Sequence, residues 1–460
     1  MLAEARSAYF TEARRWQSWL DVEAALARVQ AEAGIIPEWA ARDITAAARL
    51  ETLDLDDLRA EIARTMAPVH ALSRSLAAAS GEAGAWVHWG ATTQNVIDTG
   101  RLLVLKDLQS DLKVRLAGVL TQMCNLAEAH ARTPMVGRTN RQHALPITFG
   151  FKVAGWIDET IRVCDQLEEC ETRLFQLRFG GAIGAFQSLG AAGPNLSARL
   201  AEDLGLRPAL YEGRAQVDVL IEYVSRLGML GVAAVRIASD LYEGMQTELG
   251  ELSEDLGHDV VGSSTMPHKV NPKLVVTLKA DANRLRSLAA SAYCVSPPSH
   301  EGDAATNQEL RSLVNDTALL ALRVAQQLCE TLTVIEVDHD GMAQNLASSG
   351  DLTALESVMM HLAPKLGRGT AHNLLHDAAT RARTTGMSLE RLVAEVSEVT
   401  GALDTAALRR LFDPVQNTGQ SAEIARQLAA AGRARAEGLG AVTGVTLTAA
   451  ATAGLAAQRS

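Results

Sequence analysis

Apolar residues repeat at alternating spacings of three and four over a long proline-free part of this chain. The repeat lies between Pro208 and Pro267, which are consecutive prolines in the sequence. Its positions are Leu220, Val224, Leu227, Gly231, Ala234, Ala238, Leu241, Met245 and Leu252. Heptad spacing is typical of a helix that packs lengthwise against other helices, and its small residues would let two helices approach closely. The sequence therefore predicts one long helix over this repeat.

Further periodic segments predict more helices. An amphipathic helix is predicted over residues 11–33, and another over residues 273–292. A second apolar repeat runs from Leu105 to Leu126 and stops before Pro134. No segment shows a convincing strand pattern, and aromatic residues make up only 4% of the chain. We therefore expect an all-α fold built around a bundle of long helices.

The helical periods divide the 460-residue chain into three expected domains. Residues 1–104 would form an N-terminal helical domain, residues 105–351 the central long-helix domain, and residues 352–460 a small C-terminal helical domain with shorter periods. The two long apolar repeats would leave too much apolar surface exposed on a single chain. We therefore expect other subunits to complete the bundle.

The composition excludes several kinds of partner. A formal net charge of −11 at pH 7 leaves no broad field of lysine and arginine for nucleic acid or an anionic membrane. The five cysteines are odd in number and form no CxxC pair, and no apolar run is long enough to span a membrane. The sequence favours a cytoplasmic protein that binds neither nucleic acid nor membrane. No carboxylate cluster indicates a metal, and no cofactor is expected.

Three polar stretches interrupt the helical pattern, each combining hydroxyl, amide or basic side chains with glycine or proline. They are HWGATTQNVIDTG (residues 88–100), GRTNRQHALPITFG (137–150) and GSSTMPHKVNP (262–272). One interpretation is that they only cap helices, because Ser, Thr and Asn are good N-caps and proline suits a first turn. Thr139 and Gln142 would then cap the helix after Pro146. The recurrence of such stretches favours a shared functional site instead.

The third stretch has the groups needed to bind a carboxylate. It offers hydroxyls, one cation and one amide, from Ser263, Ser264, Thr265, Lys269 and Asn271. The N-terminus of the following helix would add partial positive charge and free N–H donors. A serine among such donors loses its proton at lower cost, because groups that stabilise an oxyanion also stabilise an alkoxide. An anionic small molecule is therefore the expected ligand.

The same stretch meets every fixed position of GSSxMPxKxNP, the signature loop of the fumarase/aspartase superfamily, which the chain resembles. Residues 88–100 and 137–156 resemble the first and second regions of that superfamily. Residues 342–372 resemble its branch of carboxymuconate cycloisomerases and adenylosuccinate lyases. The resemblance implies a three-domain, all-helical subunit whose central helices join in a homotetramer, with each active site built from three subunits.

The resemblance also implies roles for individual residues. Ser263 would be the catalytic base that removes the proton next to a carboxylate. Lys269 and Asn271 would hold that carboxylate as its second negative charge develops. The other implied substrate-binding residues are donors from the three stretches and two residues identified by position: Thr92, Thr93, Thr139, Asn140, Gln142, Ser264, Arg178 and Gln216.

Three histidines lie in or beside the same stretches. His268 occupies a variable position of the signature loop, so the resemblance favours an exposed or subunit-contacting residue over a base. His88 and His143 are expected to be hydrogen-bonded residues that position their neighbours, and not metal ligands.

Several positions depart from the adenylosuccinate lyase pattern. Asn140 stands where those lyases have a histidine associated with protonating the leaving group. Asn95 replaces an aspartate, Ala67 a histidine and Gly302 an arginine. An asparagine cannot cycle a proton near neutral pH, so the site lacks that acid, and the missing arginine weakens the case for a nucleotide substrate. A small anionic dicarboxylate with a good leaving group fits these residues better.

The leading hypothesis is therefore β-elimination from a 2-substituted succinate, through an aci-carboxylate intermediate, to give fumarate. Nitrosuccinate is the favoured substrate, because nitrite is a weak base that departs without an acid. Three alternatives stay open: a 3-carboxy-cis,cis-muconate cycloisomerase, a C–N lyase similar to adenylosuccinate lyase, and an inactive structural relative that kept the tetramer. The intact signature loop argues against the last.

Overall fold

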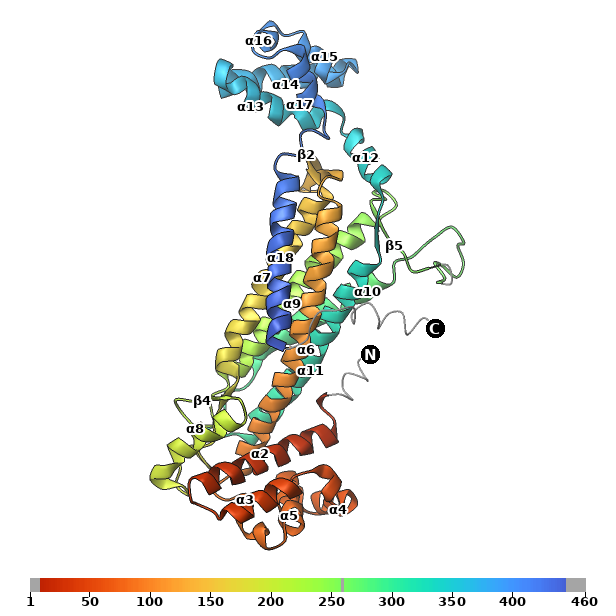
Figure 1. Cartoon of the computed structure of the whole chain (residues 1–460). Coiled ribbons are helices and arrows are strands. Elements are labelled where there is room, and N and C mark those ends of the chain that lie inside the picture. The colour runs from red at the N-terminus through yellow and green to blue at the C-terminus, as the bar shows by residue number, and fades with distance from the viewer. Residues whose placement is uncertain (1–8, 258–259, 444–460) are drawn as a thin grey trace. The chain divides into compact units, whose positions relative to one another are not determined.

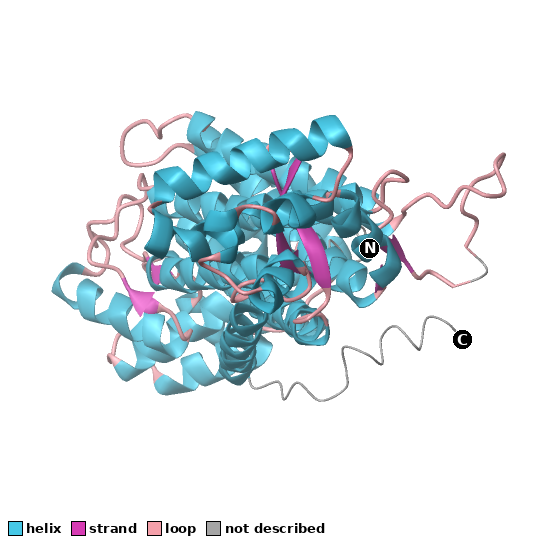
Figure 2. Ribbon diagram, turned by 90° about the horizontal axis from the view of Figure 1, so that it is seen from above, coloured by secondary structure: helices cyan, strands magenta, loops and turns pink. Residues whose placement is uncertain are grey.

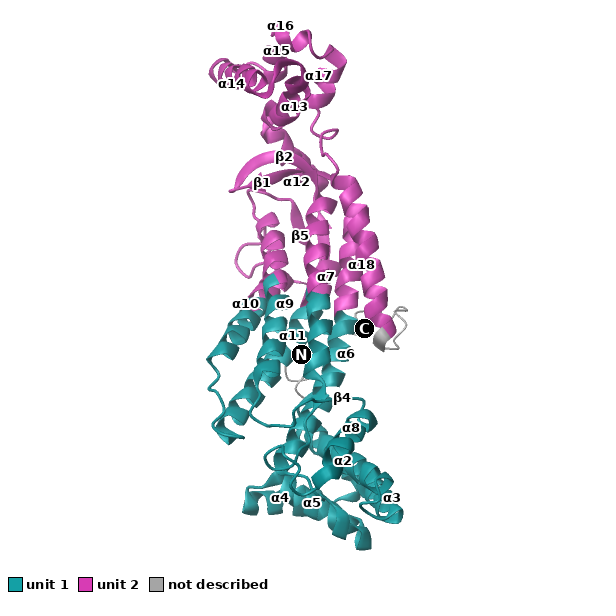
Figure 3. Cartoon of the chain, turned by 90° about the vertical axis from the view of Figure 1, so that its left-hand side faces the viewer, with its two compact units in different colours: residues 1–115, 163–232, 281–326 teal, residues 116–162, 233–280, 327–460 magenta. Residues whose placement is uncertain are grey.

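The structure, a computed structural model, describes residues 9–257 and 260–443 and is predominantly helical, which confirms the all-α class (Figures 1 and 2). The chain divides into two compact units (Figure 3). Unit 1 holds residues 1–115, 163–232 and 281–326, and unit 2 holds residues 116–162, 233–280 and 327–460. In the described part of the chain, the helices that contribute to both units are α6 (Thr93–Ala129), α7 (Phe149–Leu174), α9 (Asp218–Gly244), α10 (Leu274–Ser291) and α11 (Ala304–Thr333).

Unit 1 also contains the N-terminal helices and one small parallel sheet. Its remaining elements are α2 (Glu12–Glu32), α3 (Glu38–Ala47), α4 (Leu55–Thr65), α5 (Pro68–Ala79), α8 (Gly193–Asp203), β3 (Gln176–Leu177) and β4 (Arg207–Pro208). Helix α2 matches the helix predicted over residues 11–33. The Thr11 side chain caps it by accepting a hydrogen bond from the Arg14 N–H (3.0 Å), and Trp16 and Trp19 are buried.

Unit 2 also contains two antiparallel strand pairs and the C-terminal helices. Its remaining elements are β1 (Pro134–Thr139), β2 (Gln142–Thr148), β5 (Leu252–Glu254), β6 (Ile335–Val337), α12 (His339–Ser348), α13 (Leu355–Leu366), α14 (Arg368–Thr385), α15 (Leu389–Ala394), α16 (Ser397–Thr400), α17 (Thr405–Phe412) and α18 (Ser421–Thr443). Helices α13 to α17 share a core that includes Val358, Leu375 and Leu392. The expected division into three domains stays a prediction.

Small residues let the long helices pack closely, as the apolar repeat predicted. In unit 1, a Cβ on Gly231 of α9 would lie 3.1 Å from the Ala282 carbonyl oxygen of α10. In unit 2, a Cβ on Gly432 of α18 would lie 2.6 Å from the Cys124 sulfur of α6. Larger side chains at either glycine would force these helices apart.

Two expectations about secondary structure were wrong. Helix α9 ends at Gly244, and Leu252 belongs to β5, although it continues the apolar repeat. The β1–β2 hairpin was missed because its register shifts between Val136 and Arg138, which breaks the alternation of buried and exposed residues that identifies a strand.

The reason given for subunit association also needs correction. The repeat positions Leu112, Leu116 and Leu227 are fully buried within the single chain. A different stripe of α9 is exposed instead: Met229 is 41% and Val232 38% exposed. Together with residues of α10 they line an open groove of unit 1. We therefore expect this groove, and not the heptad repeat, to take part in any contact between subunits.

We expect the Met229→Glu, Val232→Glu double variant to weaken a homotetramer, because two carboxylates would be buried without partners at a subunit contact. Light scattering at micromolar concentration should show the wild type as a tetramer and the double variant at lower mass. The control is Val415→Glu, which adds a carboxylate at another exposed apolar residue, in the loop after α17. A monomeric wild type would contradict the expectation.

Candidate active site

The first polar stretch ends in the N-terminus of α6. The Asn95 side chain is buried, and its Oδ1 accepts a hydrogen bond from the Thr92 N–H (3.3 Å), which caps the helix. Its Nδ2 donates to the Arg178 carbonyl oxygen (3.3 Å), a bond that an aspartate could not make. The hydroxyls of Thr92 and Thr93 make no hydrogen bond to any described residue, so both are available to a ligand.

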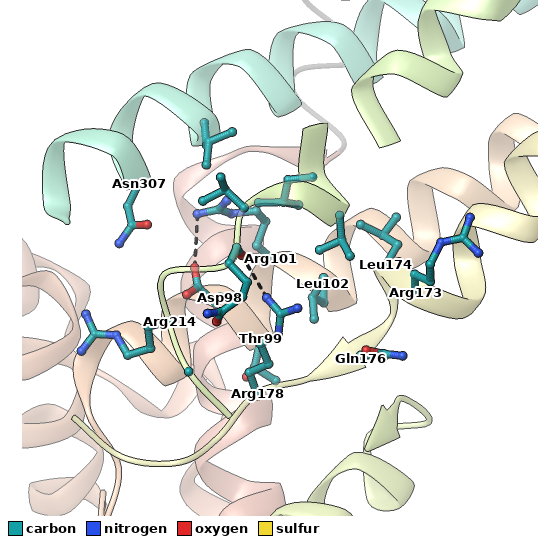
Figure 4. A pocket seen from close by; sticks show the side chains of 16 residues that line it. Asp98, Thr99, Arg101, Leu102, Arg173, Leu174, Gln176, Arg178, Arg214 and Asn307 are labelled. Carbon is teal, nitrogen blue, oxygen red and sulfur yellow. Dashed lines mark hydrogen bonds and ion pairs between the residues drawn. The ribbon is translucent and has the colours of Figure 1, made fainter. Parts of the chain in front are cut away.

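Arg178 and Gln216 are neighbours in unit 1, as the candidate site requires. The Arg178 Nη1 donates to the Gln216 carbonyl oxygen (3.0 Å). Both residues line a cavity of about 80 Å³ together with Asp98, Arg101 and Arg214 (Figure 4). Hydrogen bonds thus connect the start of α6 to Arg178 and on to Gln216.

Glu212 fixes the segment that follows Arg178. Its buried carboxylate accepts hydrogen bonds from the Phe179 N–H and from the Ser197 hydroxyl (2.9 Å). Burial raises the pKa of Glu212, although both hydrogen bonds act in the opposite direction. No sequence signal indicated Glu212, because its partners lie elsewhere along the chain.

The second polar stretch forms the β1–β2 hairpin of unit 2. Asn140 and Arg141 are the turn residues, with φ angles of 50° and 63°, and Thr139 pairs with Gln142 on either side of them. Positive φ at both central residues is typical of a type I′ turn. All four residues are exposed, so their side chains are free to contact a ligand.

The capping interpretation is wrong for Thr139 and Gln142. Helix α7 begins at Phe149, and Thr148 caps it, since its Oγ1 accepts a hydrogen bond from the Phe151 N–H (3.2 Å). Thr139 and Gln142 lie in strands that precede this cap.

A buried ion pair holds the hairpin in place. The two Nη atoms of Arg138 donate to the two oxygens of Glu251 (2.7 and 3.0 Å), whose side chain is only 4% exposed. Asn345 of α12 donates to the same carboxylate (2.9 Å). Bidentate charged pairs fix orientation as well as distance. The position of the Asn140 turn therefore depends on Glu251 and Asn345, which the sequence did not single out.

Both histidines beside these stretches are hydrogen-bonded, as predicted. His143 Nδ1 bonds to the Ser349 hydroxyl, and His88 Nδ1 lies 2.5 Å from the Glu23 carboxylate. Desolvation lowers the pKa of His88, but the hydrogen bond and the negative charge of Glu23 raise it more, so the net shift is upward. In the described ranges no group of three or more His, Cys, Asp or Glu side chains is arranged to hold a metal ion.

The signature loop, residues 262–273, folds back on itself. The Asn271 N–H donates to the Gly262 carbonyl oxygen (3.3 Å), and the Lys269 N–H donates to the Met266 carbonyl oxygen (3.0 Å). A Cβ on Gly262 would lie 2.7 Å from the Lys269 carbonyl oxygen, so only glycine allows this approach. The loop is thus closed by its own backbone.

Ser263 lies inside this closed loop and is half-buried. Its Oγ accepts hydrogen bonds from the backbone N–H groups of Thr265 (3.4 Å) and Met266 (3.2 Å). Donors aimed at an oxygen stabilise its deprotonated form more than its neutral form. This geometry supports the role of base that the resemblance implies for Ser263.

The expected use of the α10 N-terminus is wrong. Glu254 already occupies it: its carboxylate accepts hydrogen bonds from the N–H groups of Lys273 (2.7 Å), Leu274 (3.2 Å) and Val275 (2.7 Å). These donors and the partial positive charge of the helix are therefore neutralised within the protein. An anion at this loop would therefore be bound by the side chains of the loop and not by the helix N-terminus.

Residues 264–270 of the signature loop are all exposed, and three of them carry polar or charged groups of interest to the site. They are Ser264, His268 and Lys269, and the Lys269 ammonium has no carboxylate partner among the described residues. Asn271 is half-buried and lines a cavity of about 240 Å³ beneath the loop. With respect to the described residues, the Lys269 ammonium is thus available to bind a carboxylate.

The candidate residues fall into separate groups. Thr92, Thr93, Arg178 and Gln216 belong to unit 1, and the other seven belong to unit 2. Within unit 2, Thr139 lines a cavity of about 650 Å³ that no residue of the signature loop lines. Among the residues described, no helix is long and apolar enough to cross a membrane.

Comparison with known families identifies the chain. A family model described as Lyase matches residues 2–285, more than half of the sequence. The chain belongs to the fumarase/aspartase superfamily of lyases. A second model, described as Adenylosuccinate lyase C-terminus, matches residues 351–428 of this lyase.

Individual relatives of this lyase align over almost its whole length. A 3-carboxy-cis,cis-muconate cycloisomerase of Pseudomonas aeruginosa is 37% identical in sequence. The alignment covers 93% of this chain and 94% of that enzyme. An N-acetyl-S-(2-succino)cysteine lyase of Enterococcus italicus is 32% identical with the same coverage. A fumarate lyase from Mesorhizobium sp. BNC1, whose crystal structure is known, is 32% identical in sequence. Its structure superposes on this chain with a TM-score of 0.84, over 93% of this chain and 97% of that lyase.

We expect Ser263→Ala to abolish turnover, because no other side chain of the loop accepts hydrogen bonds from backbone N–H groups. The fold and oligomeric state should not change, since the Ser263 hydroxyl carries no contact between elements. Turnover is measured on the substrate that the wild type converts, with Ser397→Ala, an exposed serine of α16, as the control. Activity within a few-fold of wild type would rule out Ser263 as the base.

Lys269→Met should lower both substrate binding and rate, because a free ammonium offsets the carboxylate charge in the ground state and in the transition state. Lys279→Met, on α10, removes a lysine outside the signature loop and is the matched control. Steady-state kinetics measure the effect. An unchanged kcat/KM for Lys269→Met would remove Lys269 from the site.

Proposed function

We propose that this lyase catalyses β-elimination from nitrosuccinate to give fumarate and nitrite. The observation that carries the proposal is the amide of Asn140 at the exposed turn of the β1–β2 hairpin. At the same position the resemblance implies a histidine acid in adenylosuccinate lyases. An amide cannot supply a proton near neutral pH, so the leaving group must depart as a stable anion.

The fold does not require asparagine at this turn. A φ of 50° is adopted by asparagine, aspartate and histidine more readily than by other non-glycine residues. A histidine would therefore fit the same backbone. The amide at position 140 is better explained by the chemistry of the leaving group than by the geometry of the turn.

The proposed reaction begins with proton removal from C3 of the substrate by the Ser263 alkoxide, which its two backbone donors stabilise. The electron pair of the C–H bond passes into the adjacent carboxylate and forms the aci-carboxylate, whose second negative charge Lys269 and Asn271 offset. That pair then forms the C2–C3 double bond as the C2–N bond breaks. Nitrite leaves with its electron pair, and the Asn140 amide donates a hydrogen bond to its oxygens.

The remaining residues of the proposed site supply neutral hydrogen-bond donors. The hydroxyls of Thr92 and Thr93 lack partners among the described residues, and Thr139, Gln142 and Ser264 are exposed. We propose that they bind the substrate oxygens in a homotetramer whose active sites are each shared among three subunits.

A second candidate is 3-carboxy-cis,cis-muconate cycloisomerase activity. The specific observation that favours it is the 37% identity to the Pseudomonas aeruginosa enzyme of that name. An intramolecular addition or elimination of this kind also need not use an acid at position 140. The two functions differ in their products, so direct assays separate them.

We expect the purified enzyme to release nitrite and fumarate from nitrosuccinate, and to act poorly on aspartate, malate and adenylosuccinate. General acid catalysis contributes about 10²–10⁴-fold, so an enzyme without the acid should be slower on those substrates by roughly that factor. Fumarate absorbance and nitrite release measure the reaction. Efficient cleavage of aspartate or adenylosuccinate would contradict the proposal, and turnover of carboxymuconate without nitrite release would establish the second candidate.

Asn140→His tests the role of the amide directly. The change should alter nitrosuccinate turnover by less than a few-fold, because protonating nitrite late in bond cleavage helps little. Turnover of the amine substrates should rise. Arg141→His places the same side chain at the other turn residue and should give no such gain. A large gain on nitrosuccinate from Asn140→His would show that the leaving group does need an acid.

A further inference from the structure

A cavity of unit 1 is lined by an unusual number of arginines. Its volume is about 80 Å³, and it lies among the start of α6, the β3 segment, the chain before α9 and the start of α11 (Figure 4). The charged residues that line it are Asp98, Arg101, Arg173, Arg178 and Arg214. Four cations and one carboxylate thus surround a small space.

Two of these arginines make no salt bridge to a carboxylate of the described residues, although each interacts electrostatically with Asp98. Arg173 pairs with Glu222 (2.8 Å) and Arg101 with Asp98 (3.4 Å). Arg178 and Arg214, by contrast, donate only to backbone carbonyl oxygens, those of Gln216 and Ala182. In the residues that the structure describes, the Nη2 atoms of both make no hydrogen bond. The cavity therefore has free guanidinium donors and an excess of positive charge.

The Arg214 guanidinium lies against Gly302. A Cβ on Gly302 would be 3.1 Å from the Arg214 Nη2 and 3.4 Å from its Cζ. The absence of a side chain at position 302 therefore makes room for this guanidinium. The sequence-based argument considered only the arginine missing at position 302, whereas the structure has the Arg214 guanidinium beside Gly302.

Glu212 holds both free arginines on segments that pack together. Its carboxylate accepts a hydrogen bond from the N–H of Phe179, the residue after Arg178, and Arg214 follows Glu212 by two positions. A Cβ on Gly180 would lie 2.7 Å from the Glu212 Cβ, so the two backbones approach closely. The guanidiniums are thus positioned before any ligand binds.

The size of the cavity limits the ligand. One water-sized group needs about 10–15 Å³, so about 80 Å³ holds roughly five to eight non-hydrogen atoms. A carboxylate with a short carbon chain fits this volume. Planar guanidiniums with paired N–H donors match the geometry of a carboxylate.

We propose that this cavity binds one carboxylate of the substrate and that Arg214 is the residue that determines this specificity. The inference rests on the proposed function for the identity of the substrate, a dicarboxylate. It adds a subsite that the polar stretches did not indicate, since Arg101 and Arg214 lie outside the candidate residues.

Calorimetry with fumarate tests the subsite without requiring turnover. A hydrogen bond to a charged group is worth about 1.5–3 kcal/mol, so Arg214→Gln should weaken fumarate binding by roughly tenfold to a hundredfold. Arg214→Lys should lose less, because it keeps the charge. Gly302→Leu should also weaken binding, because a larger side chain would occupy the space beside the Arg214 guanidinium. Arg207→Gln, an exposed arginine of β4 that does not line the cavity, is the matched control.

A crystal structure with fumarate should place a carboxylate oxygen within hydrogen-bond distance of the Arg214 Nη2. Fumarate bound elsewhere, unchanged affinity in Arg214→Gln, or tighter binding of inorganic phosphate than of fumarate would each overturn the proposal. If Arg214→Gln does not fold, Arg214→Lys and Gly302→Leu decide. Fumarate in the cavity without nitrite release from nitrosuccinate would refute the proposed function and leave the subsite standing.

Discussion

Hydrogen-bonded glutamate carboxylates, two of them buried, hold the polar segments of this lyase in place. Glu212 fixes the segment after Arg178, Glu251 fixes the β1–β2 hairpin, and Glu254 fixes the start of α10. A carboxylate is costly to bury unless its oxygens are hydrogen-bonded. Glu212 and Glu251 can therefore be buried only when their own segments are folded against them, and all three segments gain their fixed positions from these bonds.

The helices could be predicted because the evidence for them is local. Periodicity placed α2 and α10 to within one residue at each end. The end of α9 could not be placed in this way, because the apolar repeat continues to Leu252 although the helix has already ended. The chain turns back after Gly244, so that a Cβ on Gly244 would lie only 2.7 Å from the Leu252 side chain. The β1–β2 hairpin was missed because its bulge interrupts the period of two.

The candidate residues of the signature loop could be named because their motif is contiguous. Their partners could not, because the pairs form only in the folded chain: Glu254 precedes Lys273 by 19 residues, and Glu251 follows Arg138 by 113. The same limit explains the error at α10, whose N–H groups look free in the sequence. Residue type and spacing indicate which groups can do chemistry, whereas tertiary contacts decide which of them are still free to do it.

Positions 214 and 302 share one space beside the cavity, because the Arg214 guanidinium lies where a side chain at position 302 would begin. Arginine at both positions would crowd two like charges into that space, and a small residue at both would leave the cavity with one guanidinium fewer. The side chain that fits at one position therefore depends on the residue at the other, and the energetic effects of changes at the two positions are not expected to add.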